Sequence, residues 1–121
     1  ERAAVVAAMR AVDARERPLC RRVLEFLATK PAVAVLGRAD AASVDAGARL
    51  PIVAFKHATR AAPEIVAACH AARVAMRHGD MYSRPLLDAL AIDGGVARIS
   101  LAHYNTEEEV ERFIAAMDPV L

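Results

Sequence analysis

The stretch Gly95-Val-Ala-Arg-Ile-Ser-Leu-Ala-His-Tyr-Asn-Thr-Glu-Glu-Glu-Val110 decides the fold, because it has the pattern of a strand followed by a capped helix. Side chains alternate between the two faces of an extended chain, so Ile99 and Leu101 share one face while Arg98 lies on the other. We therefore predict a strand over 96–101 that buries Ile99 and Leu101 and holds Arg98 on a rigid element.

The second half of this stretch has the signals of a helix start. Thr106 is a good N-cap residue, and Glu109 follows it at the spacing of a capping box. Further glutamates in the first turn suit the positive end of the helix dipole. The apolar residues behind the cap recur at helical spacing: Val110, Phe113, Ile114 and Met117. An arginine on a strand that leads into such a helix is well placed to hold an anion.

Upstream, apolar residues at three- and four-residue steps predict a helix over 2–28, which Pro18 should kink or divide. Short apolar runs predict strands at 33–36, 51–55 and 73–77. Proline signals predict a helix from Pro63 to about Ala72 and a short helix over 85–90, with Leu86, Leu87 and Leu90 buried. Residues 38–49 are polar and predict a loop.

These elements give the order αββαβαβα, which favours an α+β fold with a small, mostly antiparallel sheet of about four strands covered by helices. A length of 121 residues fits a single domain over 1–121. The apolar share is 56%, but 29 residues are alanine, which suits close packing of helices on a small sheet. The chain begins at Glu1 and enters a helix at once, so we expect it to be part of a longer protein.

Composition also excludes several classes of function. The net charge is +1 and the fourteen arginines are scattered, so a nucleic-acid surface is not expected. No run is long enough to span a membrane, and no signal-peptide pattern is present. Cys20 and Cys69 have no metal or redox spacing and fit reduced thiols of a cytoplasmic protein. The four histidines match no metal-ligand motif, so we expect no metal site.

Two motifs carry a family resemblance. Arg98-Ile-Ser followed by His103-Tyr-Asn-Thr, together with Arg77 and Gly79 at the end of an earlier strand, resembles the C-terminal small domain of class V aminotransferases. That family includes the cysteine desulfurases and uses pyridoxal phosphate. The resemblance implies that Arg98 binds the α-carboxylate of an amino-acid substrate, with Arg77 as a secondary anion contact. A planar guanidinium suits this role because it matches a carboxylate with two parallel hydrogen bonds.

The loop after Arg77 departs from the family pattern. In desulfurases of this class it carries a cysteine that attacks the substrate sulfur, and alignment through Arg77, Gly79 and Pro85 places Tyr82 there. A tyrosine cannot accept sulfur as a persulfide, so the usual desulfurase activity is not expected. Tyr82, His78 and His103 are candidates for contact with substrate or cofactor, and packing or hydrogen bonding explains each of them equally well.

The resemblance implies the C-terminal domain of a pyridoxal-phosphate-dependent transferase or lyase that acts on a small amino acid. The cofactor would serve as an electron sink, and its Schiff-base lysine would lie in the large domain of the same chain, because Lys30 and Lys56 stand in no matching context. The fragment alone would be inactive, and the whole enzyme would be a homodimer. Transamination, racemisation, lyase chemistry and desulfuration all stay open. The alternative is a stand-alone, non-catalytic α+β module that binds an amino acid or a protein partner.

Overall fold

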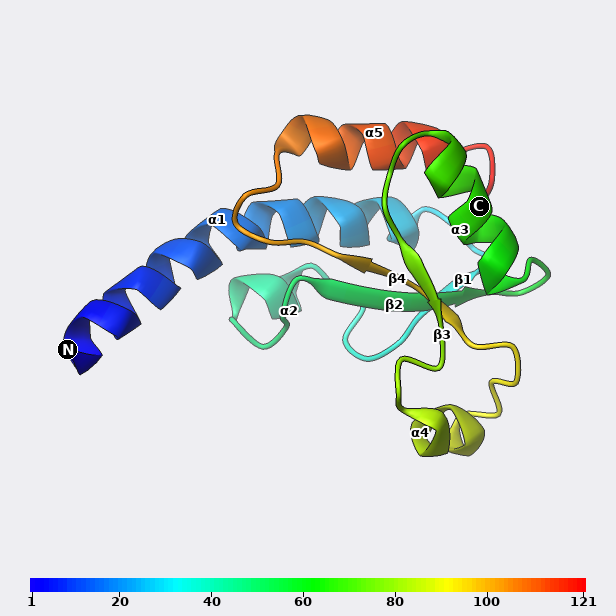
Figure 1. Ribbon diagram of the computed structural model, residues 1–121, viewed down its shortest axis with the longest axis horizontal. Helices are drawn as coiled ribbons and strands as arrows, with labels where there is room; N and C mark the ends of the chain where they lie inside the picture. The colour runs from blue at the N-terminus through cyan, green and yellow to red at the C-terminus, as the bar shows by residue number, and fades with distance from the viewer.

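A four-stranded sheet lies at the centre of the molecule, in a computed structural model that describes residues 1–121 (Figure 1). The strands stand in the order β1-β2-β4-β3, and every neighbouring pair is antiparallel. This arrangement confirms the predicted α+β fold with a small antiparallel sheet. The strand bounds are β1 Val33–Val35, β2 Ile52–His57, β3 Arg77–Gly79 and β4 Val96–Ser100.

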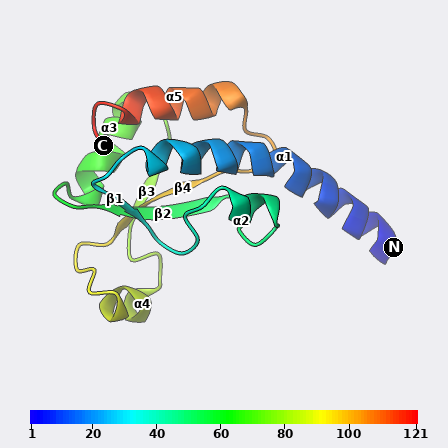
Figure 2. The ribbon, with the colours of Figure 1, turned by 180° about the vertical axis from the view of Figure 1, so that it is seen from behind.

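Five helices surround the sheet, one more than the sequence predicted. Three of them, α1, α3 and α5, cover one face, and α4 lies beyond the other (Figures 1 and 2). The main core fills the space between the sheet and these three helices, where Phe55 and Phe113 are fully buried. The helix bounds are α1 Arg2–Ala28, α2 Ala42–Asp45, α3 Ala62–Ala71, α4 Arg84–Ala89 and α5 Glu107–Met117.

The first helix runs from Arg2 to Ala28 as a single element that contains Pro18. Its ribbon changes direction along the way, and its N-terminal half projects from the rest of the molecule (Figure 1). All of its buried residues lie from Leu19 onward, whereas Val5 and Met9 are more than half exposed. Among the five helices, none combines the length and the apolar character that crossing a lipid bilayer requires.

The strand and helix of the opening stretch form as predicted, except that the strand ends at Ser100 and Leu101, just after it, is only partly buried against the core. In β4, Ala97 and Ile99 are buried in the main core, while Arg98 lies on the opposite face and is half-buried. The Thr106 hydroxyl accepts a hydrogen bond from the Glu109 amide at 3.2 Å, and the Glu109 carboxylate accepts one from the Thr106 amide at 3.0 Å. This is a complete capping box. The local signals were sufficient here because the strand and the helix bury the faces that their patterns indicate.

The third predicted strand, over 73–77, was wrong. The chain leaves α3 through Arg73, which has a left-handed backbone with a φ of 58°. The Val74 amide then donates to the Cys69 carbonyl at 3.0 Å, so this segment closes the end of the helix instead of joining the sheet. Pairing begins only at Arg77, which stands opposite Arg98. Met76 is nevertheless buried in the core, which explains the alternating pattern.

Residues 38–49 were predicted as a polar loop, but they contain the short helix α2. The Asp40 carboxylate accepts from the Ser43 amide at 2.7 Å, and the Ser43 hydroxyl donates to the Asp40 carbonyl at 2.7 Å. These bonds start a turn that buries Val44 against the core. The helix α2 could not be predicted from periodicity, because Val44 is its one large apolar residue.

The sequence predicted a short helix over 85–90 with three buried leucines; the helix α4 forms, but the burial was wrong for two of the leucines. Leu87 is buried and packs with Ile92 and Val96 in a second, small cluster on the far side of the sheet. Leu86 and Leu90 are 55% and 48% exposed. The reason is geometric, since a helix of six residues presents little more than one turn to the sheet.

Candidate anion-binding site

Two arginines face each other across the strand pair β3 and β4. Arg77 and Arg98 are direct partners in the antiparallel register, so their side chains leave the sheet on the same side. Both line a pocket of about 220 Å³ on the face opposite the main core. We call this the Arg98 pocket; its lining residues are Arg77, His78, Gly79, Asp80, Met81, Tyr82 and Arg98.

Neither arginine of the pocket has an internal partner. Arg98 makes no ion pair and no side-chain hydrogen bond, and its Nε atom is buried without an acceptor. Several exposed arginines elsewhere are paired, for example Arg22 with Glu111 at 2.6 Å and Arg84 with Asp88 at 2.6 Å. Buried donors without acceptors are rare in folded proteins, and two like charges opposite each other destabilise a sheet. The pair is therefore suited to an acceptor from outside this chain.

One carboxylate, that of Asp80, lines the Arg98 pocket, and it forms no ion pair with either arginine. Asp80 Oδ1 accepts a hydrogen bond from the Tyr82 amide at 2.9 Å, which ties the carboxylate to its own loop. No salt bridge joins Asp80 to Arg77 or Arg98. Asp80 was not among the predicted site residues, although an aspartate whose carboxylate can reach the backbone amide two residues later is a usual signal of a turn.

The loop that follows β3 has an unusual backbone. Met81 and Tyr82 have φ angles of 54° and 59°, which is the left-handed region that residues with a Cβ seldom adopt. Met81 packs against the small cluster of Leu87, Ile92 and Val96. Tyr82, by contrast, is 98% exposed. In this loop, Met81 is therefore packed against the protein, and the side chain of Tyr82 next to it is exposed to solvent.

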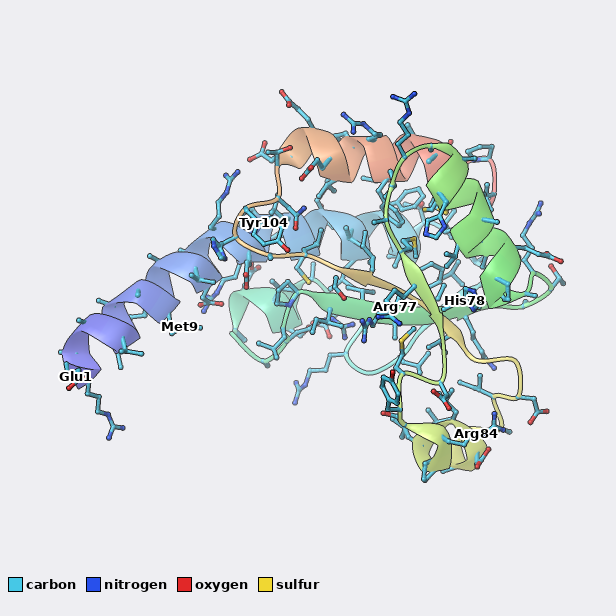
Figure 3. The ribbon with its side chains drawn as sticks, in the orientation of Figure 1. Glu1, Met9, Arg77, His78, Arg84 and Tyr104 are labelled. Atoms are coloured by element: carbon cyan, nitrogen blue, oxygen red, sulfur yellow. The ribbon has the colours of Figure 1, made fainter.

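The two histidines among the predicted site residues differ in position. His78 is exposed and lies on the other side of β3 from Arg77, as expected for neighbours in a strand (Figure 3), and it contributes to the rim of the Arg98 pocket. His103 does not line this pocket. Its ring packs edge-on against Tyr104, with 5.5 Å between ring centroids, and Tyr104 lies far from Arg77 (Figure 3). The structure therefore brings Arg77, Arg98 and Tyr82 together at the pocket. His78 lines the pocket from a strand position that faces the other way, and His103 lies elsewhere.

No lysine or reactive thiol of this chain lies in the Arg98 pocket. Lys30 Nζ is 2.8 Å from a carboxylate oxygen of Asp118, and Lys56 lines a separate pocket at the end of β2. Both cysteines are buried, and desolvation raises the pKa of the Cys69 thiol to about 11. A thiol with such a pKa is almost fully protonated near neutral pH, so it is a poor nucleophile. The structure has no group of three or more His, Cys, Asp or Glu side chains placed to hold a metal ion.

Comparison with known proteins assigns the family. Residues 5–113 match the aminotransferase class-V family. The chain is 35% identical over 114 residues to the aminotransferase-like protein FGM3 of Gibberella zeae, a match that covers 92% of this chain and 28% of that protein. It is also 50% identical over 44 residues to a probable cysteine desulfurase of Vibrio cholerae, which covers 36% of this chain and 11% of that protein.

Solved structures agree on the fold. The chain superposes on the apo structure of a cysteine desulfurase from Thermococcus onnurineus NA1 with a TM-score of 0.80 and 24% identity, over 91% of this chain and 26% of that one. The cysteine desulfurase CsdA of Escherichia coli gives a TM-score of 0.72, over 88% of this chain and 24% of that one. The chain thus spans about a quarter of the length of these proteins. It belongs to the class V aminotransferase family.

Proposed function

We propose that this chain is the C-terminal small domain of a longer pyridoxal-phosphate-dependent enzyme of the class V aminotransferase family, and that Arg98 binds the carboxylate of its amino-acid substrate. Family membership supports the enzyme class. The observation that carries the role of Arg98 is its buried Nε atom without an acceptor, in a pocket where no carboxylate of this chain pairs with it.

The strand explains why an arginine at this position can orient a substrate. β4 lies between β2 and β3, so its backbone is fixed by strands on both sides. A guanidinium held on such a strand can give a carboxylate two parallel hydrogen bonds without first being ordered. Arg77 extends the positive charge on the same face and serves as the second anion contact.

The residues of this chain do not by themselves fit the cofactor. Pyridoxal phosphate is held through a lysine, and neither Lys30 nor Lys56 lines the Arg98 pocket. We place the cofactor lysine in the remainder of the longer protein, where the cofactor supplies the electron sink for carbanion chemistry. The contribution of this chain is to bind and orient the substrate, and the chain alone would be inactive. By its resemblance to the family, the longer enzyme is a homodimer.

The test of this role is Arg98→Gln in the full-length enzyme. We expect kcat/KM for the amino-acid substrate to fall by about 100-fold, because charge-assisted hydrogen bonds to a carboxylate are lost. Cofactor content, read from the visible absorption of the purified protein, should stay unchanged. Arg112→Gln is the matched control, since Arg112 is exposed on α5 and makes no ion pair. Unaltered kinetics in Arg98→Gln would refute the carboxylate role.

A further inference from the structure

We infer that the strained turn at Met81 and Tyr82 presents the phenol of Tyr82 to the same carboxylate that Arg98 binds, which makes Tyr82 a second substrate-binding residue of the pocket. This inference rests on the proposed function, because it requires a substrate carboxylate in the Arg98 pocket. It goes beyond that function by giving a role to a side chain that does nothing for the fold.

The backbone of the turn is left-handed at two residues in a row. Met81 and Tyr82 are consecutive residues with a φ of 54° and 59°, and a side chain in this region crowds the following carbonyl oxygen. Two other residues share this conformation, Arg73 and Ala91. Those two follow the ends of α3 and α4, where a single left-handed residue is an ordinary way to finish a helix. The pair at Met81 and Tyr82 ends no helix and needs another explanation.

Specific contacts hold this backbone in place. The Asp80 carboxylate accepts from the Tyr82 amide at 2.9 Å, and the Ser83 amide donates to the Asp80 carbonyl at 2.9 Å. Met81 is half-buried against the cluster of Leu87, Ile92 and Val96. The surroundings therefore determine the conformation of the turn, as is typical of strained residues at functional sites.

The strain is not balanced by any contact of the Tyr82 side chain. Tyr82 is 98% exposed and its phenol makes no hydrogen bond within the chain. A glycine at this position would fit the backbone more easily and would sacrifice no packing. A fold optimised only for stability would not expose a tyrosine here, which points to a role for this side chain in the pocket that it lines.

The pocket supplies that role. Tyr82 lines the Arg98 pocket together with Arg77 and Arg98. A carboxylate has about four acceptor positions, and one guanidinium occupies two of them, so acceptor capacity remains for a phenol O–H. A neutral donor adds affinity and direction without adding to the positive charge of the two arginines. The inferred ligand is thus a carboxylate held by Arg98 and by the Tyr82 hydroxyl.

The first experiment compares Tyr82→Phe with Tyr104→Phe in the full-length enzyme. These residues are the only tyrosines of this chain, both are exposed, and Tyr104 lies outside the Arg98 pocket. We expect Tyr82→Phe to raise KM for the amino-acid substrate about 10-fold with little change in kcat, because one hydrogen bond to a charged group is lost. Tyr104→Phe should leave both constants unchanged. An unaltered KM in Tyr82→Phe overturns the inference.

The second experiment uses nitration by tetranitromethane, with modified peptides located by mass spectrometry. A mixture of the standard amino acids without tyrosine and cysteine, which themselves react with tetranitromethane, should protect Tyr82 but not Tyr104, and Arg98→Gln should abolish the protection. Equal nitration of Tyr82 with and without amino acids overturns the inference. If Arg98→Gln loses activity while Tyr82 stays unprotected, only the role of Tyr82 fails. If Arg98→Gln is fully active, the proposed function itself fails.

A third comparison tests the strain separately. Tyr82→Gly and Tyr82→Ala both remove the phenol, but only glycine adopts the left-handed backbone freely. Glycine is normally the more destabilising of the two residues. A higher melting temperature for the glycine variant therefore shows that the turn is strained, and equal or lower values overturn that part of the inference.

Discussion

Glu109 shows what one side chain contributes at the start of a helix. Its carboxylate accepts hydrogen bonds from the Asn105 side chain and the Thr106 amide, both at 3.0 Å. The hydrogen bond from the Asn105 side chain, followed by that from the Thr106 backbone, lowers the pKa of the Glu109 carboxyl below its ordinary value of 4.5. The ionised form is thus the one that stabilises the folded chain.

This lowered pKa predicts how stability depends on pH. A carboxyl with a lower pKa in the folded state contributes stability that is present above its unfolded pKa and is lost as the pH falls through the folded value. We expect Glu109→Gln to be less stable than the natural sequence at pH 7, and the difference to shrink as the pH falls below about 4.5, near the unfolded pKa of a glutamate. Urea titrations at several pH values measure this difference in the free energy of unfolding.

The control for this prediction is Glu108→Gln. Glu108 lies in the same first turn, so it feels the same helix dipole, but it makes no hydrogen bond in the structure. Its substitution should change stability less and with a weaker pH dependence. Equal pH profiles for the two variants would show that charge near the helix start matters and the capping box does not.

At the scale of elements, the strand pair β3 and β4 depends on a close backbone contact. Gly95 has a φ of 77°, and a Cβ placed on it would lie 2.8–2.9 Å from backbone atoms of Gly79. A side chain here would therefore both strain the backbone and push the two strands apart. Only glycine allows the chain to enter β4 so close to the end of β3.

We predict that Gly95→Ala destabilises the fold by about 2–5 kcal/mol, the sum of a left-handed alanine and an overpacked contact. Gly94→Ala is the matched control, because its Cβ would meet nothing within 4 Å. It should change stability by less than about 0.5 kcal/mol. Chemical denaturation measures the stability of the two variants. Similar denaturation midpoints would contradict the importance of the close contact between Gly95 and Gly79.

The elements also show where reasoning from sequence succeeds. β4 and α5 were predictable because alternation, a capping box and an apolar stripe are local signals, and tertiary packing agreed with them. The segment 73–76 has the same alternation, yet it closes the end of α3, since burial of Val74 and Met76 requires no strand. Alternation reports which side chains are buried, and it does not report what the backbone pairs with.

At the scale of the whole molecule, large exposed apolar residues lie on α1, just before β2 and around α4. Leu50 is 73% exposed, Leu86 and Leu90 about half, and Val5 and Met9 more than half. Single exposed apolar residues are common on protein surfaces. The stronger indication of a longer protein is length, since the chain spans about a quarter of its relatives.

We therefore predict that the natural protein is several times larger than the 12.9 kDa of this chain. An antibody raised against the 121 residues should detect one such species in extracts of the source cells, and that species should carry the visible absorption of bound pyridoxal phosphate. A band at the size of this chain would instead favour a stand-alone module that binds an amino acid or a protein partner.

The Arg98 pocket was predictable only in part. Alternation placed Arg98 on the free face of its strand, and the family resemblance suggested Arg77, His78 and Tyr82, which all line the pocket. His103 was grouped with them by its motif alone, but three residues beyond a strand end are enough to carry a side chain elsewhere. Arg77 and Arg98 lie opposite each other because of the register of β3 and β4. Register is a long-range property that no local sequence pattern contains.

The strand order has a consequence for synthesis on the ribosome. β4 inserts between β2 and β3, although it follows both of them in the chain (Figure 1). The first two strands can pair early, but the third has no neighbour until residues 96–100 have emerged. Arg98 therefore arrives with the strand that completes the sheet, so a nascent chain completes its sheet and brings Arg98 opposite Arg77 in the same step.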